Sequence, residues 1–252
     1  MADIRYIDDD FVAVRAQPKA GARRIVTLAF GDQVHVLGQE DGWTQVRVLE
    51  YFSRPFRGWV RGTLPVRDKG VLRLSMVDVQ QGDGFVLETP GGQIVLIDGG
   101  DNKLFARHVA ARYRHRAATP EKPLDVAAIV ITPGDADHFD GLNDIARSED
   151  LPDYQKHKRL AIHPRRVFHN GLVKRPYRDA RGRRLKDAEM FGPTTEHEGR
   201  LHAIDLKDEL RGLPAAELNR PFEHWVKSLD HWSTRGPIDV RRVAFGMDEA
   251  AL

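Results

Sequence analysis

Residues with metal-binding and acid–base chemistry concentrate in one short segment. Asp135, Asp137 and His138 lie within four positions of one another in the run TPGDADH, residues 132–138. Carboxylate oxygens and imidazole nitrogens bind hard and borderline divalent cations. The sequence has no cysteine, so any metal ion must be held by His, Asp or Glu side chains. The same residues also suit a helix N-terminus, where Asp135 or Asp137 caps free backbone N–H groups, and the segment alone leaves both interpretations open.

The elements around this segment indicate a layered α/β arrangement. The continuous apolar run Leu124–Ile131 comes directly before it and predicts a strand buried on both faces, and we expect a helix to begin after His138. Open α/β sheets bind their ligands at the carboxyl ends of strands, which is where this segment stands. Upstream, the pattern predicts strands at 72–79, 84–90 and 93–100 and a helix at 102–116.

The remaining sequence falls into two further regions. Residues 148–200 are polar and loop-like with one strand at 165–169, and they precede expected helices at 203–211 and 215–232 and a strand at 239–245. Residues 11–66 contain five short runs of alternating apolar and polar residues, punctuated by Gly, Pro and Asp. Short strands at this spacing favour a small closed β-barrel, because closure removes exposed edges.

The 11–66 region resembles bacterial SH3-like domains. The shared features are V-R-x-x-P at 14–18, G-D-x-V at 31–34, an acidic turn before Trp43, and Gly58-Trp59-Val60. The resemblance implies a binding or docking module for a protein partner, with no catalytic residue. Packing in the core or at the barrel rim explains Trp43 and Trp59 better than stacking on a ligand.

Three motifs of the second region resemble the metallo-β-lactamase superfamily, most of all its ComEC-type branch. They are VDVQQGDG at 77–84, LIDGG at 96–100, and the segment T-x-x-D-A-D-H-F-x-G-L beginning at Thr132. The resemblance implies an αββα hydrolase fold and one or two bound metals, usually zinc. A metal-bound hydroxide then attacks an ester, amide or phosphodiester.

The resemblance also assigns roles to particular residues. The family's metal motif is H-x-[HD]-x-D-H, so Asp135 stands at the second ligand position, and Asp137 and His138 at the pair that serves the second metal. Asp137 is also the expected catalytic residue, since it holds the attacking water. Asp98 matches an acid beside the metals that orients the ligands. Gly82 and Asp83 match a structural turn.

The sequence departs from this family in two ways. Pro133 stands where the family has its first histidine, and a proline ring has no donor atom for a metal. A second αβ half, with an aspartate in a G-D turn and a histidine in an H-H-G-S segment, does not appear before Leu252. We therefore expect a fragment, one piece of a split protein, or a degenerate copy of the domain.

Two histidines are further ligand candidates. His163 and His169 lie in AIHPRRVFHNG, and each is also explained as a loop histidine in a basic surface. The H-N-G segment at 169–171 resembles one that follows the metal motif in related hydrolases, so we include His169 among the expected ligands. His197, His202, His224 and His231 have no spacing typical of ligands.

Positive charge is concentrated just after the metal motif. Residues 156–186 carry twelve Lys and Arg against one acid, Asp179, a local balance of +11; the rest of the chain, with 27 basic and 36 acidic residues, has −9. Such a stretch is typical of a protein that binds a phosphate-rich partner such as nucleic acid, and a solvated surface loop is the simpler alternative.

The sequence thus predicts an α+β protein with an SH3-like β-barrel at 1–67 and a partial metallo-β-lactamase domain at 71–252. We expect a zinc-dependent, nuclease-like hydrolase of a phosphodiester, nucleic acid or nucleotide. The alternative is a catalytically degenerate binding or regulatory protein that keeps the fold. The acidic start and the absence of an apolar run of about 18 residues predict a cytoplasmic protein without a membrane partner.

Overall fold

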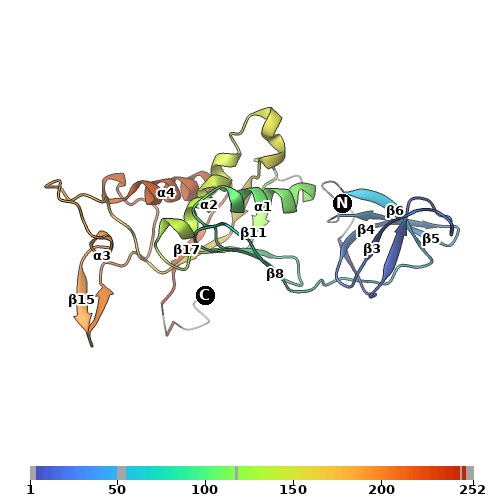
Figure 1. The fold of residues 1–252 in the computed structure, drawn as a ribbon, viewed down its shortest axis with the longest axis horizontal. Coiled ribbons are helices and arrows are strands. Elements are labelled where there is room, and N and C mark those ends of the chain that lie inside the picture. The colour runs from blue at the N-terminus through green and yellow to red at the C-terminus, as the bar shows by residue number, and fades with distance from the viewer. Residues whose placement is uncertain (1–3, 50–54, 117–118, 245, 248–252) are drawn as a thin grey trace. The chain divides into compact units, whose positions relative to one another are not determined.

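The computed structural model describes residues 4–49, 55–116, 119–244 and 246–247 (Figure 1). The chain is a mixed α+β protein, as the sequence predicts, and it divides into two compact units. The first unit comprises Met1–Arg73, Glu88–Gln93 and Ala111–Ala117. The second comprises Leu74–Leu87, Ile94–Ala110 and Ala118–Leu252.

The N-terminal region forms a curled antiparallel sheet. Its seven strands are ordered β3-β2-β6-β5-β4-β1-β7. The five predicted strands are present, and two short ones that the sequence pattern did not indicate, β1 and β7, extend the sheet at one side. The strands are β1 (Arg5–Ile7), β2 (Val12–Arg15), β3 (Arg24–Leu28), β4 (Gln33–Glu40), β5 (Trp43–Val48), β6 (Phe56–Arg61) and β7 (Val66–Arg67).

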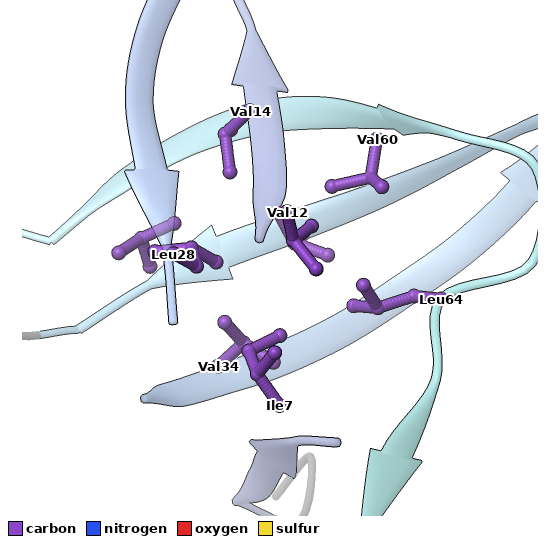
Figure 2. Packing of buried hydrophobic residues seen from close by; sticks show 9 residues of the cluster. Ile7, Val12, Val14, Leu28, Val34, Val60 and Leu64 are labelled. Carbon is purple, nitrogen blue, oxygen red and sulfur yellow. The ribbon is translucent and has the colours of Figure 1, made fainter. Parts of the chain in front are cut away.

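A cluster of nine buried aliphatic side chains lies inside this sheet, and the partly buried Phe56 packs against it. Figure 2 shows the cluster of buried side chains, which are Ile7, Val12, Val14, Leu28, Val34, Val46, Val48, Val60 and Leu64. The register shifts between Val36 and Gly38, and such a bulge increases the local twist that curls a sheet. At Gly58 of β6 an added Cβ would lie 2.3 Å from Val14, so only glycine permits this close approach of β6 and β2. Burial of the aliphatic cluster holds the curled sheet together.

The second unit is built on a six-stranded sheet ordered β17-β14-β12-β10-β9-β8. Four neighbouring strands of this sheet, β10, β12, β14 and β17, are parallel to one another. The strands are β8 (Arg73–Met76), β9 (Gly84–Glu88), β10 (Ile94–Asp98), β12 (Ala128–Val130), β14 (Arg166–His169) and β17 (Asp239–Arg242).

Three helices connect the parallel strands. They are α1 (Leu104–Tyr113), α2 (Ala136–Ser148) and α4 (Arg220–Ser233). Each connection leads to the neighbouring parallel strand, and the strand order moves steadily from β10 to β17. Right-handed crossovers that all move toward the same edge of a sheet bring their helices to one face of it. Figure 1 shows the three helices on one side. Phe139 of α2 packs against Phe222 of α4 with ring centroids 4.8 Å apart, which ties the helices together.

The smaller elements surround this sheet. A two-stranded sheet pairs β11 (Leu124–Val126) with β13 (Ile162–Pro164), and a hairpin pairs β15 (Thr194–His197) with β16 (Arg200–Ala203). The short helices are η1 (Arg114–Arg116), η2 (Asp153–Lys158), α3 (Asp187–Met190) and η3 (Ala215–Glu217). No helix of the described residues is long and apolar enough to cross a membrane.

Several predicted boundaries are wrong. The run 124–131 is two strands in two different sheets rather than one. Helix α2 begins at Ala136, so His138 lies in its first turn instead of before it. The last helix begins at Arg220, after the side chain of Asn219 accepts a hydrogen bond from the Phe222 N–H. The predicted helix at 203–211 does not form. The strand predicted to reach residue 245 ends at Arg242, and residue 245 lies outside the described residues.

Candidate functional site

The three motifs of the second region meet where strands β10 and β12 end. The amide of Asn102 donates to the Val79 carbonyl oxygen at 2.8 Å, and the Gly141 N–H donates to the Gly100 carbonyl oxygen at 2.9 Å. At Gly82, with φ +80°, an added Cβ would lie 1.7 Å from the carbonyl oxygen of Asp137. The 77–84 turn is therefore packed directly against the first turn of α2.

Asp98 is the most completely buried acid of the site, with 2% of its surface exposed. Its Oδ1 accepts a hydrogen bond from the Thr132 N–H at 2.9 Å. Its Oδ2 accepts from the Thr132 hydroxyl at 2.6 Å and lies 2.9 Å from Nδ1 of His138. Both carboxylate oxygens are thus engaged, and Asp98 joins the end of β10 to the loop before α2 and to α2 itself.

His138 and Asp137 lie beside this carboxylate in the first turn of α2. Because the Asp98 carboxylate only accepts, the His138 ring donates from Nδ1, and this tautomer leaves Nε2 with a lone pair whenever the ring carries one proton. The Nε2 atom lies 4.0 Å from Oδ1 of Asp137. Both side chains are partly exposed.

Asp135 is engaged differently from the other motif residues. It occupies the N-cap position of α2, but its side chain makes no capping hydrogen bond. Its Oδ1 instead lies 2.5 Å from the ammonium group of Lys174, which also lies 2.6 Å from Oδ1 of Asp187. Burial favours the neutral amine, but the hydrogen bonds to both acids outweigh it and raise the pKa of Lys174. Asp135 is therefore paired with a resident cation of the protein.

His169 ends β14, next to the strand that leads into the motif. The side-chain amide of Asn170 donates to the Thr132 carbonyl oxygen at 3.0 Å, so the H-N-G segment packs against the motif loop. The His169 ring is buried, and its Nδ1 accepts the Gly171 N–H at 3.1 Å. Burial lowers the pKa of His169 to about 4, more than the neighbouring backbone of Asp208 raises it. His169 is a neutral, internally bonded side chain of this loop.

We use the name strand-end cluster for Asp98, Thr132, Asp135, Asp137 and His138. The donors of this cluster and His169 do not fit a zinc site in this arrangement. Within the strand-end cluster, only the Asp137 carboxylate and Nε2 of His138 have no stronger partner among the described residues, and outside it the buried Nε2 of His169 has no hydrogen-bond partner there either. Structural and catalytic zinc sites have at least three protein ligands. No group of three or more His, Asp or Glu side chains in the described part of the chain is arranged to hold a metal.

The other histidines lie outside the strand-end cluster. His163 is in β13, and its ring lies about 3.0 Å from where a Cβ on Gly236 would stand. His197 and His202 face each other in the β15–β16 hairpin with ring centroids 6.1 Å apart. Nδ1 of His224 lies 2.6 Å from the Arg147 guanidinium on the surface between α2 and α4.

Sequence reasoning missed Lys174, Thr132 and Asn170. Lys174 belonged to a basic run that predicted a surface loop, yet it is 9% exposed. Thr132 and Asn170 hold the two loops of the site together through Asp98 and the Thr132 carbonyl oxygen. The apolar pair Leu172-Val173 directly before Lys174 was a weak signal, because the acidic partners of the lysine are distant in the sequence.

Acidic side chains neutralise half of the basic run, and all of them except Asp179 lie outside it. Six of its twelve cations have acidic partners among the described residues, and these pairs are Arg159–Asp153, Arg165–Asp125, Arg166–Asp239, Lys174–Asp135, Arg175–Asp205 and Arg183–Asp179. The unpaired half includes Arg178, Arg181, Arg184 and Lys186, which are exposed. The free positive charge is therefore concentrated at 177–186.

Residues 177–186 form a small turn-closed loop, which we call the basic loop. Its two sides are joined by hydrogen bonds from the Leu185 N–H to the Tyr177 carbonyl oxygen at 2.9 Å and from the Asp179 N–H to the Arg183 carbonyl oxygen at 3.0 Å. The Arg178 guanidinium lies 5.5 Å from the centroid of the exposed Tyr177 ring.

Comparison with known proteins identifies the class of the N-terminal region. Residues 10–65 match the family model described as the bacterial SH3 domain, which agrees with the curled antiparallel sheet. The chain thus carries a bacterial SH3 domain, and Trp43 packs in its core. No curated protein and no solved structure matches the chain.

Proposed function

We propose that this chain binds a phosphate-rich polymer, such as DNA or RNA, on the basic loop, and that its SH3 domain docks it to a protein partner. In this proposal the second unit is a metallo-β-lactamase-like domain that retains the framework of the active site without its metal centre. This corresponds to the catalytically degenerate binding protein that the sequence offers as the alternative to a hydrolase.

The observation that carries the proposal is the double ion pair of Lys174. Its ammonium group lies within 2.6 Å of both Asp135, at the start of α2, and Asp187, at the start of α3. The basic loop lies between Lys174 and Asp187 in the sequence, so both of its ends are tied to the carboxyl edge of the sheet. Its exposed cations are therefore held next to the strand-end cluster instead of moving freely.

The charge and the side-chain types of this loop suit a polyanion. Arg178, Arg181, Arg184 and Lys186 form no salt bridge among the described residues, although the charge of Lys186 acts on Glu189, so binding phosphates breaks no salt bridge. Guanidinium groups bind phosphate oxygens through two parallel hydrogen bonds. The exposed ring of Tyr177 offers a flat surface on which a base can stack.

The SH3 domain supplies the second part of the proposal. Domains of this kind often mediate protein interactions. Its exposed Phe11 and Phe30 are apolar groups available to a partner.

A nucleic-acid titration with matched variants tests polymer binding. We expect the full chain to bind a labelled oligonucleotide with an affinity that falls steeply as salt rises, because each neutralised phosphate releases counterions. The variant R181A/R184A/K186A should lose most of this binding. The control R159A/R165A/R166A removes the same charge from cations that are already paired, and it should bind almost normally. Equal losses in both variants, or no binding at about 50 mM salt, would refute the proposal.

The metal-dependent hydrolase remains a second candidate function because of one contact. A buried carboxylate that binds Nδ1 of a histidine, as Asp98 does with His138, is the usual way of orienting a metal-ligating imidazole. Phosphodiesterase activity can be assayed with bis(p-nitrophenyl) phosphate and added zinc or manganese. We expect no turnover, whereas turnover that disappears in both D137A and H138A would establish the hydrolase.

A further inference from the structure

A cavity of about 220 Å³ lies between α1, the last turn of α2 and η2, on the helical side of the second unit. Its walls carry four basic side chains, Lys103, Arg107, Arg147 and Lys158, and one acidic side chain, Asp144. None of these residues belongs to the strand-end cluster or to the basic loop. The cavity is a second concentration of positive charge in the molecule.

Most of this charge has no counter-ion. Arg147 is the exception, because its guanidinium donates to Asp144 at 2.9 Å and lies 2.6 Å from Nδ1 of His224. Lys158 donates to the neutral side-chain oxygen of Gln155 at 3.1 Å. Lys103 and Arg107 form no ion pair with any described residue. Three uncompensated cations thus line one concave surface, which creates a strongly positive potential there.

The remaining wall of the cavity is uncharged. Ala106 and Leu151 contribute apolar surface, and the Ser148 hydroxyl is already used, since it donates to the Ile145 carbonyl oxygen at 2.7 Å. A ligand that fits must therefore place a multiply charged anionic group against the cations and a small uncharged part against the apolar wall. Pockets for larger ligands usually have volumes above about 300 Å³, so the occupant is small.

We propose that this cavity is a binding site for a small phosphate-bearing molecule, a phosphate monoester or a diphosphate. Lys103 directly precedes α1, and Arg107 lies in the first turn of α1, where its N–H donates to the Lys103 carbonyl oxygen at 3.0 Å; the two side chains are thus one turn apart and reach the same ligand from one side. Lys158 and the free N–H groups of Gln155 reach it from η2. The site is independent of polymer binding on the basic loop, and its ligand is a small molecule.

Isothermal titration of the full chain with inorganic pyrophosphate tests the site. We expect saturable binding of one equivalent, and a loss of at least about tenfold in affinity in K103A/R107A, which removes two charge-assisted contacts. Both side chains are exposed, so the variant should melt at the temperature of the unaltered protein. Arg107→Glu should abolish binding, because it reverses one of the charges while leaving the cavity in place.

Two controls separate this site from general attraction to positive charge. The variant K19A/K156A removes two exposed lysines that do not line the cavity, and R181A/R184A/K186A removes the basic loop's cations. Both should bind pyrophosphate normally. An equal loss in K19A/K156A, a loss confined to the basic-loop variant, or the absence of saturable binding would each overturn the inference. Failure of polymer binding leaves the pyrophosphate result unaffected.

Discussion

The barrel core and the strand-end cluster are stabilised by different interactions. Nine aliphatic side chains from neighbouring strands fill the barrel, and no charged group is among them. The strand-end cluster consists of polar groups that are distant in the sequence, with 40 positions between Asp98 and His138 and 39 between Asp135 and Lys174. A local pattern of residues therefore predicts the barrel, whereas the cluster depends on which distant side chains the fold brings together.

The largest effect should follow from removing a core side chain of the barrel. Leu28 is completely buried, so Leu28→Ala should reduce the free energy of unfolding by about 2–5 kcal/mol through lost burial and the cavity left behind. Hydrogen exchange of the β2 and β3 amides should accelerate accordingly. Leu37, on the surface of the same unit, provides the control, and Leu37→Ala should have little effect. Equal effects would mean that the barrel is not held by its aliphatic cluster.

The next effect is a loss of stability at acid pH that His169, beside the site, should cause. His169 has a folded-state pKa of about 4 against an ordinary value of 6.5, so the unfolded chain binds a proton that the folded one does not. The free energy of unfolding should therefore keep its whole value above about pH 6.5. It should fall by at most about 3 kcal/mol as the pH drops toward 4. Denaturant unfolding at several pH values measures it. His169→Gln should flatten the dependence, and a change at the exposed His157→Gln instead would contradict the assignment.

A smaller effect should follow from removing the resident cation of the strand-end cluster. Lys174→Met leaves Asp135 and Asp187 unpaired, but their side chains are 39% and 71% exposed and regain water. We expect a loss of about 1 kcal/mol, together with faster hydrogen exchange throughout the basic loop. Lys227→Met removes an exposed i,i+4 pair with Glu223 and should change neither. Unchanged exchange in the basic loop would show that Lys174 does not anchor it.

The sequence predicts most of the framework of the second unit but misses features decided by distant contacts. The apolar run 124–131 reads as one strand because both of its halves are buried, yet Leu124 pairs with Ile162 while Ile129 pairs with Val167 in another sheet. A continuous apolar pattern cannot separate two successive buried strands.

The predicted helix at 203–211 shows a different limit. Its backbone groups are bonded elsewhere, since the Ile204 N–H donates to the Pro193 carbonyl oxygen and the Lys207 N–H to the Gly171 carbonyl oxygen. Distant carbonyl oxygens thus replace the i−4 partners that a helix would supply. Local propensity is a weak predictor where such long-range bonds exist.

The candidate site was predicted in part. The motifs at 77–84, 96–100 and 132–142 do come together, and Asp98, Asp137 and His138 are neighbours. The partner of Asp135 was not predictable, because no local pattern marks a lysine 39 positions away. That pairing removes Asp135 from the carboxylates that are free to bind a metal.

Zinc binding by the purified full chain tests this interpretation most directly. Metal analysis after gel filtration in buffer with added zinc, followed by calorimetric titration, gives the number and affinity of bound ions. With only the Asp137 carboxylate and Nε2 of His138 available in the strand-end cluster, we predict at most one equivalent, held too weakly to survive filtration. Two tightly held equivalents would contradict the account, since they would require Asp135 to leave Lys174 and further ligands such as His169 to join the strand-end cluster.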